Sequence, residues 1–554
     1  MSFDADAIVI GTGPSGVSVA FPMLEAGMRV LLLDGGRERD SDMLPRGAYH
    51  DIRRSDPEQW RMFLGPRYEA LRSGGPPSPK FDSPGSRFAY EGFSTSQRID
   101  GQGFTVVGSL ARGGLSTIWG AGVSVYDEED LADFPLSVSD LADSYRAVAS
   151  RIGVAGFGED DLSTPLDRMI TSAPPIPLAE NARRLLERYG RSRWPQRLGL
   201  RLGRARMAVL TARRGERLEC NACNLCLWGC ARHAIYDASQ DLPRLAAFET
   251  LDYRPGHLAL DIGTASGAYR VGVRAPGGEY GSVSAPILIM AASTFATTRL
   301  VLAWQGRYGE RLPLVTSPTV GFALLLPERI GAALPTHEFS MAHLAFSGEG
   351  PGRTPGDTAF GSLFPASGLP ASLVIERMPF SRPSSIGLHR LLQPALLLGN
   401  AFLPGRYSRN TVELQLEQDE AHLVVCAGDS PATGARLAHL RRQVAGSFAA
   451  LGAMLLPGSF TLVTPGEGLR YAGTFPMRDR PAPGEVDANC ELSGSPGLFL
   501  VDLSVFPTIP AKHASLTLMA NADRVGRRIA DNWLSNRKPG RSHEARGSAS
   551  GDPN

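Results

Sequence analysis

The chain has 554 residues and a mass of 59.2 kDa, with 43% hydrophobic and 20% charged residues. This composition is typical of a globular protein that is long enough for more than one hydrophobic core. The formal net charge of +1 gives no long-range attraction for nucleic acid or an anionic membrane, so we expect neither as a partner.

The first residues, Met-Ser-Phe-Asp-Ala-Asp, lead directly into an apolar run at 7–10. A secretory signal would need a basic start followed by an apolar stretch and a cleavage site, and we do not see this combination. Nor does the chain contain a run of about 18 apolar residues, the length of a membrane span. We therefore expect a cytoplasmic protein without a membrane span, in which clustered cysteines more often bind metal or do redox chemistry than form disulfides.

Periodicity predicts a strand, a helix and a second strand at the start of the chain, over 7–10, 17–26 and 30–33. The turn between the first two is Gly11-Thr-Gly13-Pro-Ser15-Gly16, and Asp34 ends the second strand. In such a fingerprint the glycines allow a tight turn, a close approach to pyrophosphate and close helix packing, and the carboxylate can bind a ribose hydroxyl. This unit predicts a dinucleotide site at a helix N-terminus.

Four of the six cysteines lie in one short segment with the spacing C-x2-C-x2-C-x3-C, which bacterial ferredoxins use for iron–sulfur clusters. Cys220, Cys223, Cys226 and Cys230 are therefore candidate ligands of a [4Fe-4S] or [3Fe-4S] cluster. A structural zinc site, disulfides and free thiols are the alternatives. The chain has no second run of this kind, so Cys230 must fold back onto the same cluster, stay unused or be replaced by a distant ligand such as Cys490.

The rest of the chain shows both strand-like and helix-like patterns of apolar residues. Residues 281–303 indicate another strand and helix, and the segment from there to about 464 shows the short apolar runs of a mostly β-sheet domain. Residues 498–502 are a predicted buried strand, and Ser515 to Trp533 has helical spacing. The tail from Asn536 lacks the hydrophobic content needed to fold, so we predict that it is disordered.

Four separated segments resemble the glucose-methanol-choline (GMC) oxidoreductases, a family of FAD enzymes. They are the N-terminal fingerprint with Asp34, the loop Gly113-Gly114-Leu-Ser116-Thr-Ile-Trp119-Gly120, the strand and helix at Ala291 to Leu300, and Gly473-Thr-Phe-Pro-Met477 leading to Val501-Asp502 and Thr517-Leu-Met-Ala520. Their order and spacing match the family from end to end. The resemblance implies that the AMP half of FAD lies on the fingerprint, that the loop 113–120 lies against the isoalloxazine, and that Asp502 lies near the ribityl and pyrophosphate part.

The implied fold is α/β, with a Rossmann-like FAD-binding domain assembled from discontinuous segments and a mixed-sheet α+β substrate domain. We expect the FAD domain at 1–130, 241–310 and 465–535, a helical and loop insertion with the cysteines at 131–240, the substrate domain at 311–464 and the tail at 536–554.

The chemistry that the resemblance implies is oxidation of a CH–OH group, with hydride going to the flavin and a base removing the hydroxyl proton. The family has a histidine three residues before the glycine of its Gly-Thr motif, where this chain has Arg470, and a histidine or asparagine before the last helix, where it has His513. An arginine only donates hydrogen bonds, so Arg470 cannot be the base and is instead expected to hold an anionic substrate or to stabilise an alkoxide or the reduced flavin. We expect His513 to be the base, with Tyr471 able to relay a proton.

Some FAD sugar dehydrogenases of this family carry an iron–sulfur cluster beside the flavin. We therefore predict an FAD-dependent dehydrogenase that oxidises a sugar-like or other hydroxylated metabolite and passes electrons through a cluster to a protein carrier or a quinone. The alternatives are an oxygen-using oxidase with structural zinc, and a flavin-binding partner subunit or reductive flavoenzyme with altered catalysis, which the arginine at position 470 keeps open.

Overall fold

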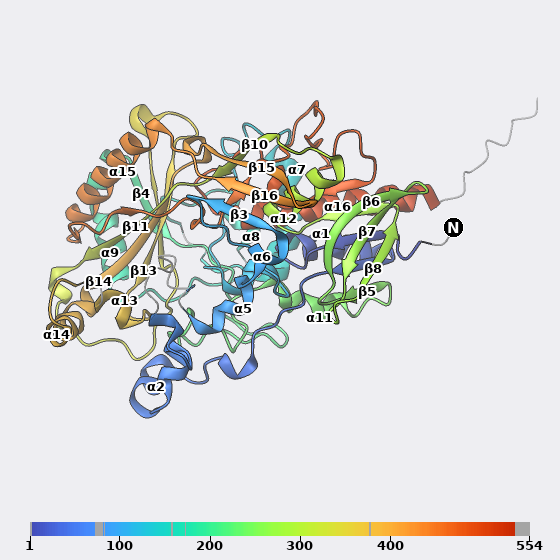
Figure 1. Cartoon of the computed structure of the whole chain (residues 1–554). Coiled ribbons are helices and arrows are strands. Elements are labelled where there is room, and N and C mark those ends of the chain that lie inside the picture. The colour runs from blue at the N-terminus through green and yellow to red at the C-terminus, as the bar shows by residue number, and fades with distance from the viewer. Residues whose placement is uncertain are drawn as a thin grey trace, which may run out of the picture.

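A five-stranded parallel sheet joins the beginning, the middle and the end of the chain. Figure 1 shows the whole chain, coloured from its N-terminus to its C-terminus. This computed structural model describes residues 3–71, 81, 83–156, 159–171, 173–375 and 378–537. The strand order is β20-β9-β1-β2-β5, with bounds Leu498–Leu500, Ile287–Met290, Ala7–Ile10, Val30–Leu33 and Leu251–Arg254. The strands β1 and β2 are buried along their whole length, as the apolar runs of a parallel sheet covered on both faces predict.

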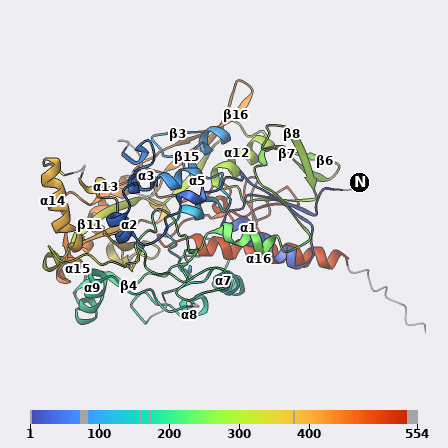
Figure 2. The ribbon, with the colours of Figure 1, turned by 90° about the horizontal axis from the view of Figure 1, so that it is seen from below.

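Long helices pack around this sheet. Helix α1 (Pro14–Glu25) lies along α16 (Ser515–Arg537), and α16 in turn contacts α7 (Val138–Ile152), as Figure 2 shows from below. Helix α12 (Thr294–Gln305) follows β9. Because α16 continues to Arg537, the predicted disordered tail begins too early at residue 536, and its remainder lies outside the described residues. A small antiparallel sheet is inserted between β5 and β9, and its strands are β6 (Leu258–Ala265), β7 (Ala268–Arg274) and β8 (Tyr280–Ala285).

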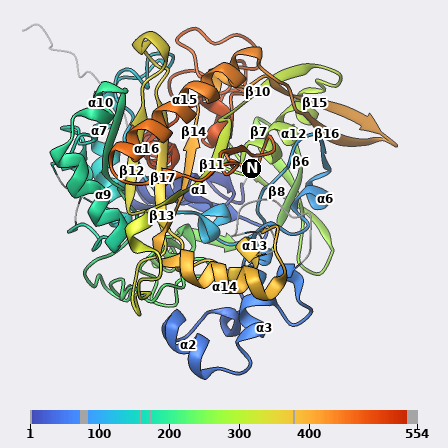
Figure 3. The ribbon, with the colours of Figure 1, turned by 90° about the vertical axis from the view of Figure 1, so that its left-hand side faces the viewer.

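The second half of the molecule is built on a seven-stranded antiparallel sheet. Its path is β17-β11-β14-β13-β12-β4, with β18 paired to β11, and the bounds are Met454–Leu455, Thr319–Leu325, Leu396–Phe402, Ala359–Pro365, Leu344–Gly348, Leu200–Arg204 and Thr461–Leu462. Apolar side chains of α9 (Glu180–Arg191) and α15 (Pro431–Ala450) form one buried cluster with this sheet. Figure 3 shows α15 lying across it.

A further five-stranded sheet connects the two halves. Its order is β19-β10-β15-β16-β3, with bounds Tyr471–Ala472, Arg311–Thr316, Asn410–Glu417, Glu420–Cys426 and Ile99–Gln102. The outer strand β3 comes from the N-terminal part of the chain, and β4 of the larger sheet comes from the cysteine-containing insertion. These two sheets therefore draw on strands outside the predicted substrate range 311–464.

The remaining α-helices are short. They are α2 (Tyr49–Ser55), α3 (Gln59–Leu64), α5 (Arg87–Tyr90), α6 (Phe93–Gln97), α8 (Asp167–Ile170), α10 (Trp194–Arg197), α11 (Leu242–Leu245), α13 (Ala371–Ile375) and α14 (Arg382–Leu392). Within the described part of the chain, no helix has the length and apolar character needed to cross a membrane.

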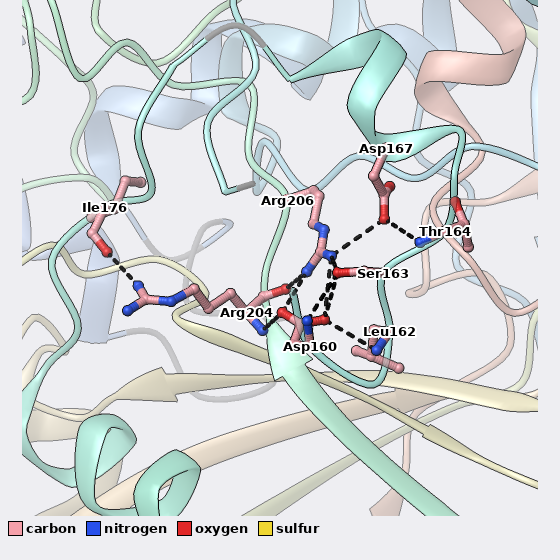
Figure 4. Close-up of polar contacts among 8 residues, drawn as sticks. All are labelled: Asp160, Leu162, Ser163, Thr164, Asp167, Ile176, Arg204 and Arg206. Carbon is pink, nitrogen blue, oxygen red and sulfur yellow. Dashed lines mark hydrogen bonds and ion pairs between the residues drawn. The ribbon is translucent and has the colours of Figure 1, made fainter. Parts of the chain in front are cut away.

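A buried cluster of ion pairs fixes the chain just after β4 (Figure 4). The guanidinium of Arg206 donates to Asp160 at 3.0 Å, to Asp167 at 3.3 Å and to the Ser163 hydroxyl at 2.8 Å. Its backbone carbonyl accepts from the amide of Val123 at 2.9 Å. The cluster therefore holds in place the segment that follows the glycine-rich loop.

Candidate active site

Two helices begin at the same edge of the parallel sheet, because they follow the neighbouring strands β1 and β9. Gly13, Pro14 and Ser15 at the start of α1, and Ser293 and Thr294 at the start of α12, line one cavity of about 180 Å³. Helix N-termini present unpaired N–H groups and a positive dipole end, so this cavity favours a group with negative charge.

Two of the three fingerprint glycines have a geometric reason to be glycine. Gly11 has a φ of +110°, and a Cβ on it would stand 2.3 Å from the carbonyl oxygen of Ala291. A Cβ on Gly16 would stand 1.9 Å from the oxygen of Gly11, which is the close packing of helix on strand. Gly13 instead faces open space, since an added Cβ meets nothing within 4 Å. The cavity therefore leaves room for a ligand directly against the Gly13 backbone.

Asp34 lies at this cavity, at the end of β2, and accepts three hydrogen bonds. The hydroxyl of Thr12 donates to it at 2.5 Å, that of Tyr253 at 2.9 Å, and the amide of Gly36 at 2.8 Å. Burial raises the pKa of this carboxyl despite these bonds. The sequence analysis did not identify Thr12 or Tyr253 as site residues, and no local signal marks Tyr253, which reaches Asp34 only because β5 pairs with β2.

The glycine-rich loop packs on the fingerprint. The amide of Gly113 donates to the hydroxyl of Thr12 at 3.1 Å, and a Cβ on Gly114 would lie 3.2 Å from the Cα of Gly13. The predicted residues Ser116 and Trp119 point elsewhere: Ser116 bonds to Gly113 and to the Ala238 amide, and the Trp119 indole donates to the carbonyl of Tyr236. Gly120, the last predicted residue of the loop, follows Trp119 just after the short 3-10 helix Gly114–Ile118.

Asp502 lines the cavity at the two helix N-termini, the predicted nucleotide cavity, from the C-terminal part of the chain. Its carboxylate accepts from the hydroxyl of Thr297 and from the amide of Ser504, and burial raises its pKa. Ser293, beside it in the cavity lining, combines a strained φ of +72° with a buried hydroxyl oxygen that has no hydrogen-bond partner among the described residues. An unpaired buried hydroxyl at a helix N-terminus is ready to bond to a ligand.

The predicted catalytic pair is in direct contact. A terminal nitrogen of Arg470, Nη2, lies 3.0 Å from Nδ1 of His513, and the other, Nη1, donates to the carbonyls of Ala511 and Lys512 at 2.7 and 3.1 Å. The guanidinium lies 3.6 Å from the ring centre of Phe402 and is only 8% exposed as a residue. Burial, with the neighbouring positive charge of Arg470, lowers the pKa of His513 to about 3.

His513 faces the backbone that follows the glycine-rich loop. A Cβ on Gly122 would stand 2.6 Å from Nε2 of His513, and the rings of Phe360 and Phe402 meet the imidazole edge-on. Tyr471 does not belong to this contact. Its hydroxyl donates to the carbonyl of Gly466 at 2.6 Å, its ring packs on Phe295, and it lines the nucleotide cavity.

The four clustered cysteines lie beyond the glycine-rich loop. All four are free, and burial raises the pKa of Cys220 to about 11 and that of Cys226 to about 12. Cys226 and Cys230 line a separate cavity of about 320 Å³ together with Ser116 and Trp119. The described residues include all four cysteines, yet among them no group of three or more side chains is arranged to hold a metal ion. The predicted metal centre is thus not supported by this arrangement of thiols.

The family model for GMC oxidoreductase matches residues 407–522, which contain Arg470, Asp502 and His513. The C-terminal part of the chain therefore matches the GMC oxidoreductase family. This match supports the expectation of an FAD-dependent oxidoreductase that acts on CH–OH groups. The predicted α/β fold, with an FAD-binding part and a mixed-sheet substrate part, is confirmed.

Two solved structures are similar to this chain in fold. Pyridoxine 4-oxidase from Mesorbium loti has 14% sequence identity and a TM-score of 0.60, and the match covers 95% of this chain and 99% of that one. Formate oxidase of Aspergillus oryzae RIB40, studied for the effect of an arginine-to-alanine mutation on FAD modification, has 12% identity and a TM-score of 0.61, with coverage of 97% and 100%. No curated protein matches the chain significantly.

The nucleotide cavity fits FAD. It combines two helix N-termini for a pyrophosphate, an unpaired hydroxyl at Ser293 and open space against Gly13. A ligand held there would be in contact with elements from both ends of the chain.

Proposed function

We propose that this GMC oxidoreductase oxidises a small hydroxylated metabolite, with the oxygen of the reacting CH–OH group bound at Arg470 and His513. The contact between these two side chains is the observation that carries the proposal. It brings together a buried cation and an imidazole next to Gly122, just after the glycine-rich loop. Both groups can donate hydrogen bonds to an oxygen on which negative charge develops.

The bound FAD supplies the acceptor for the hydride. The residues proposed to hold it are Gly11, Gly13, Ser15 and Ser293 at the two helix N-termini, with Asp34 toward the ribose and Asp502 toward the ribityl and pyrophosphate part. The loop at Gly113 and Gly114 adds backbone that approaches closely because it has no side chains. This assignment extends the sequence-based one by Ser293.

The chain's own residues orient the donor in a largely apolar site. The guanidinium of Arg470 donates to two backbone carbonyls and lies over the face of Phe402, and these contacts fix the position of its positive charge. Phe360 and Phe402 flank the imidazole of His513 and give the site apolar walls. A low-dielectric site of this kind strengthens the attraction between Arg470 and a developing oxyanion.

The route of the electrons after the flavin has two candidates. The cysteine spacing supports a relay through a cluster to a carrier or quinone, but the thiols do not fit a metal site, so we derive no step through it. The names of the two structurally similar proteins, both oxidases, support molecular oxygen instead. Iron and acid-labile sulfide in protein purified without oxygen distinguish the candidates: three or four of each per chain would establish the relay, and their absence together with hydrogen peroxide formation would establish oxygen. The cytoplasmic location stays a prediction.

Anaerobic absorbance spectra test the proposal itself. FAD-loaded protein is mixed with a panel of sugars, primary alcohols, pyridoxine and formate, and loss of the oxidised flavin bands identifies the donor. Replacement of Arg470 by methionine, which keeps much of the side-chain length and removes the charge, should slow the reduction at least 100-fold. A panel in which no donor reduces the flavin, while dithionite does, would contradict the proposal and favour the non-catalytic alternative.

A further inference from the structure

The Nδ1 atom of His513 can only be a hydrogen-bond acceptor in this structure. Its partner at 3.0 Å is the guanidinium of Arg470, which has N–H donors and no acceptor. Arginine keeps its proton at working pH, and here its pKa is lowered only to about 10 by burial. The lone pair of His513 must therefore lie on Nδ1, the nitrogen that faces Arg470.

A neutral imidazole with its lone pair on Nδ1 carries its hydrogen on Nε2. The groups around His513 keep it neutral, since the pKa of the imidazole is lowered to about 3 by burial and by Arg470. The other nearby cation, Lys512, is occupied by Asp127 at 2.6 Å and Asp130 at 2.5 Å. The Nε2 atom lies beside the Gly122 backbone.

The buried charge of Arg470 also lacks a counter-ion. Its partners are two backbone carbonyls, a histidine nitrogen and the face of Phe402, and no carboxylate of the described residues lowers the free energy of the cation. Among the described residues, Tyr126 is the one titratable side chain whose ionisation would stabilise this cation, and burial raises the pKa of that phenol well above its usual value. A buried, unpaired cation favours an anion in its vicinity.

We propose that Arg470 holds His513 as the Nε2–H tautomer, so that His513 donates a hydrogen bond to a substrate oxygen that is already deprotonated. The inference rests on the proposed function for its substrate. For an alcohol, the hydroxyl proton leaves to solvent, two electrons leave the C–H bond as hydride to the flavin, and the C–O bond becomes a carbonyl. For formate, the carboxylate whose carbon carries a hydrogen, no proton has to leave, and loss of hydride to the flavin gives carbon dioxide. Besides contacting the substrate oxygen, Arg470 then also positions His513 and makes it a donor, in place of the base expected from the sequence.

The tautomer is measured on the full chain with FAD bound and oxidised. Two-bond ¹H–¹⁵N correlation spectra of protein labelled at the histidine imidazoles distinguish a lone-pair nitrogen from a protonated one, and the signals lost in His513→Gln identify His513 among the ten histidines. We expect a lone pair on Nδ1 and a proton on Nε2, unchanged between pH 5 and pH 9. Arg470→Lys, which keeps a charged donor, should preserve this state, whereas Arg470→Glu, which offers an acceptor, should move the hydrogen to Nδ1.

Sodium formate, the smallest carboxylate, tests the anion preference, with formamide as its neutral control of similar size. We expect formate to shift the His513 Nε2 signal saturably in wild type and in Arg470→Lys, at least tenfold more weakly in Arg470→Gln, and formamide to have no comparable effect. A hydrogen on Nδ1 in the wild type, or equal responses to formate and formamide, would overturn the inference. Neither readout needs turnover, so the proposed function can fail in the donor panel while this inference stands, and the reverse.

Discussion

The Cα of Gly16 lies against the carbonyl of Gly11, so closely that a Cβ on Gly16 would stand 1.9 Å from that oxygen. A methyl group cannot fit there unless α1 moves away from β1, and we expect Gly16→Ala to lose FAD and to unfold more easily. Gly190 is the matched control, because it lies near the end of α9 and an added Cβ meets nothing within 4 Å. Gly190→Ala should keep its flavin and gain up to about 1 kcal/mol from helix propensity. Flavin content after gel filtration measures the loss of FAD in each variant, and urea unfolding measures the change in its stability.

Thr12 connects the fingerprint to the glycine-rich loop, because its hydroxyl donates to Asp34 and accepts from the Gly113 amide. In Thr12→Val both partners lose this bond inside a buried cavity, and we expect about 1–2 kcal/mol weaker FAD binding, which is roughly 5- to 30-fold in Kd. Thr12→Ser retains the hydroxyl and should bind almost normally. Fluorescence titration of the apoprotein with FAD provides the comparison, and equal Kd values for the valine and serine variants would contradict it.

Arg206 is the centre of the buried ion-pair cluster of Figure 4. Arg206→Ala leaves two buried carboxylates without their cation, so we expect the free energy of unfolding to fall by about 3–5 kcal/mol. Arg168, on the same segment, pairs with Glu159 at the surface, where both side chains are more than half exposed. Arg168→Ala should change stability by less than about 1 kcal/mol. Urea titrations that give similar losses for both variants would show that the cluster adds no stability.

The lowered pKa of His513 links stability to pH. The unfolded chain takes up a proton at this histidine near pH 6.5, and the folded protein does so only near pH 3, so stability is present above pH 6.5 and is lost as the pH falls. Between pH 7.5 and pH 5.0 the wild type should therefore lose about 2 kcal/mol more than His513→Gln. Asp130, whose pKa is raised to about 6 by burial, and the buried His343 titrate in both proteins and cancel in the difference. If the free energy of unfolding changes equally with pH in the two proteins, the lowered pKa of His513 is contradicted.

The sequence predicted the local elements of the nucleotide half closely, since β1 and β2 have the predicted bounds and α1 differs from its prediction only at its ends. Periodicity and glycine spacing act over a few residues, which is why such units can be read directly. The pairing of β3 with β16, the bond from Tyr253 to Asp34 and the contact of Arg206 with Asp160 join residues far apart in the chain, and no local pattern marks them. The family resemblance located Arg470 and His513, but only their contact gives the orientation of the imidazole.

The strand order of the parallel sheet has a consequence for synthesis of the protein. Its central strand β1 is made first, β9 follows near the middle of translation, and β20 and α16 emerge last, although α16 packs along α1. A nascent chain that stops before residue 498 lacks one edge of the sheet and leaves the apolar face of α1 without its partner helix. The flavin site can therefore be completed only when translation is nearly finished. Until then the sheet has an unpaired edge, and such an edge favours aggregation of the nascent chain.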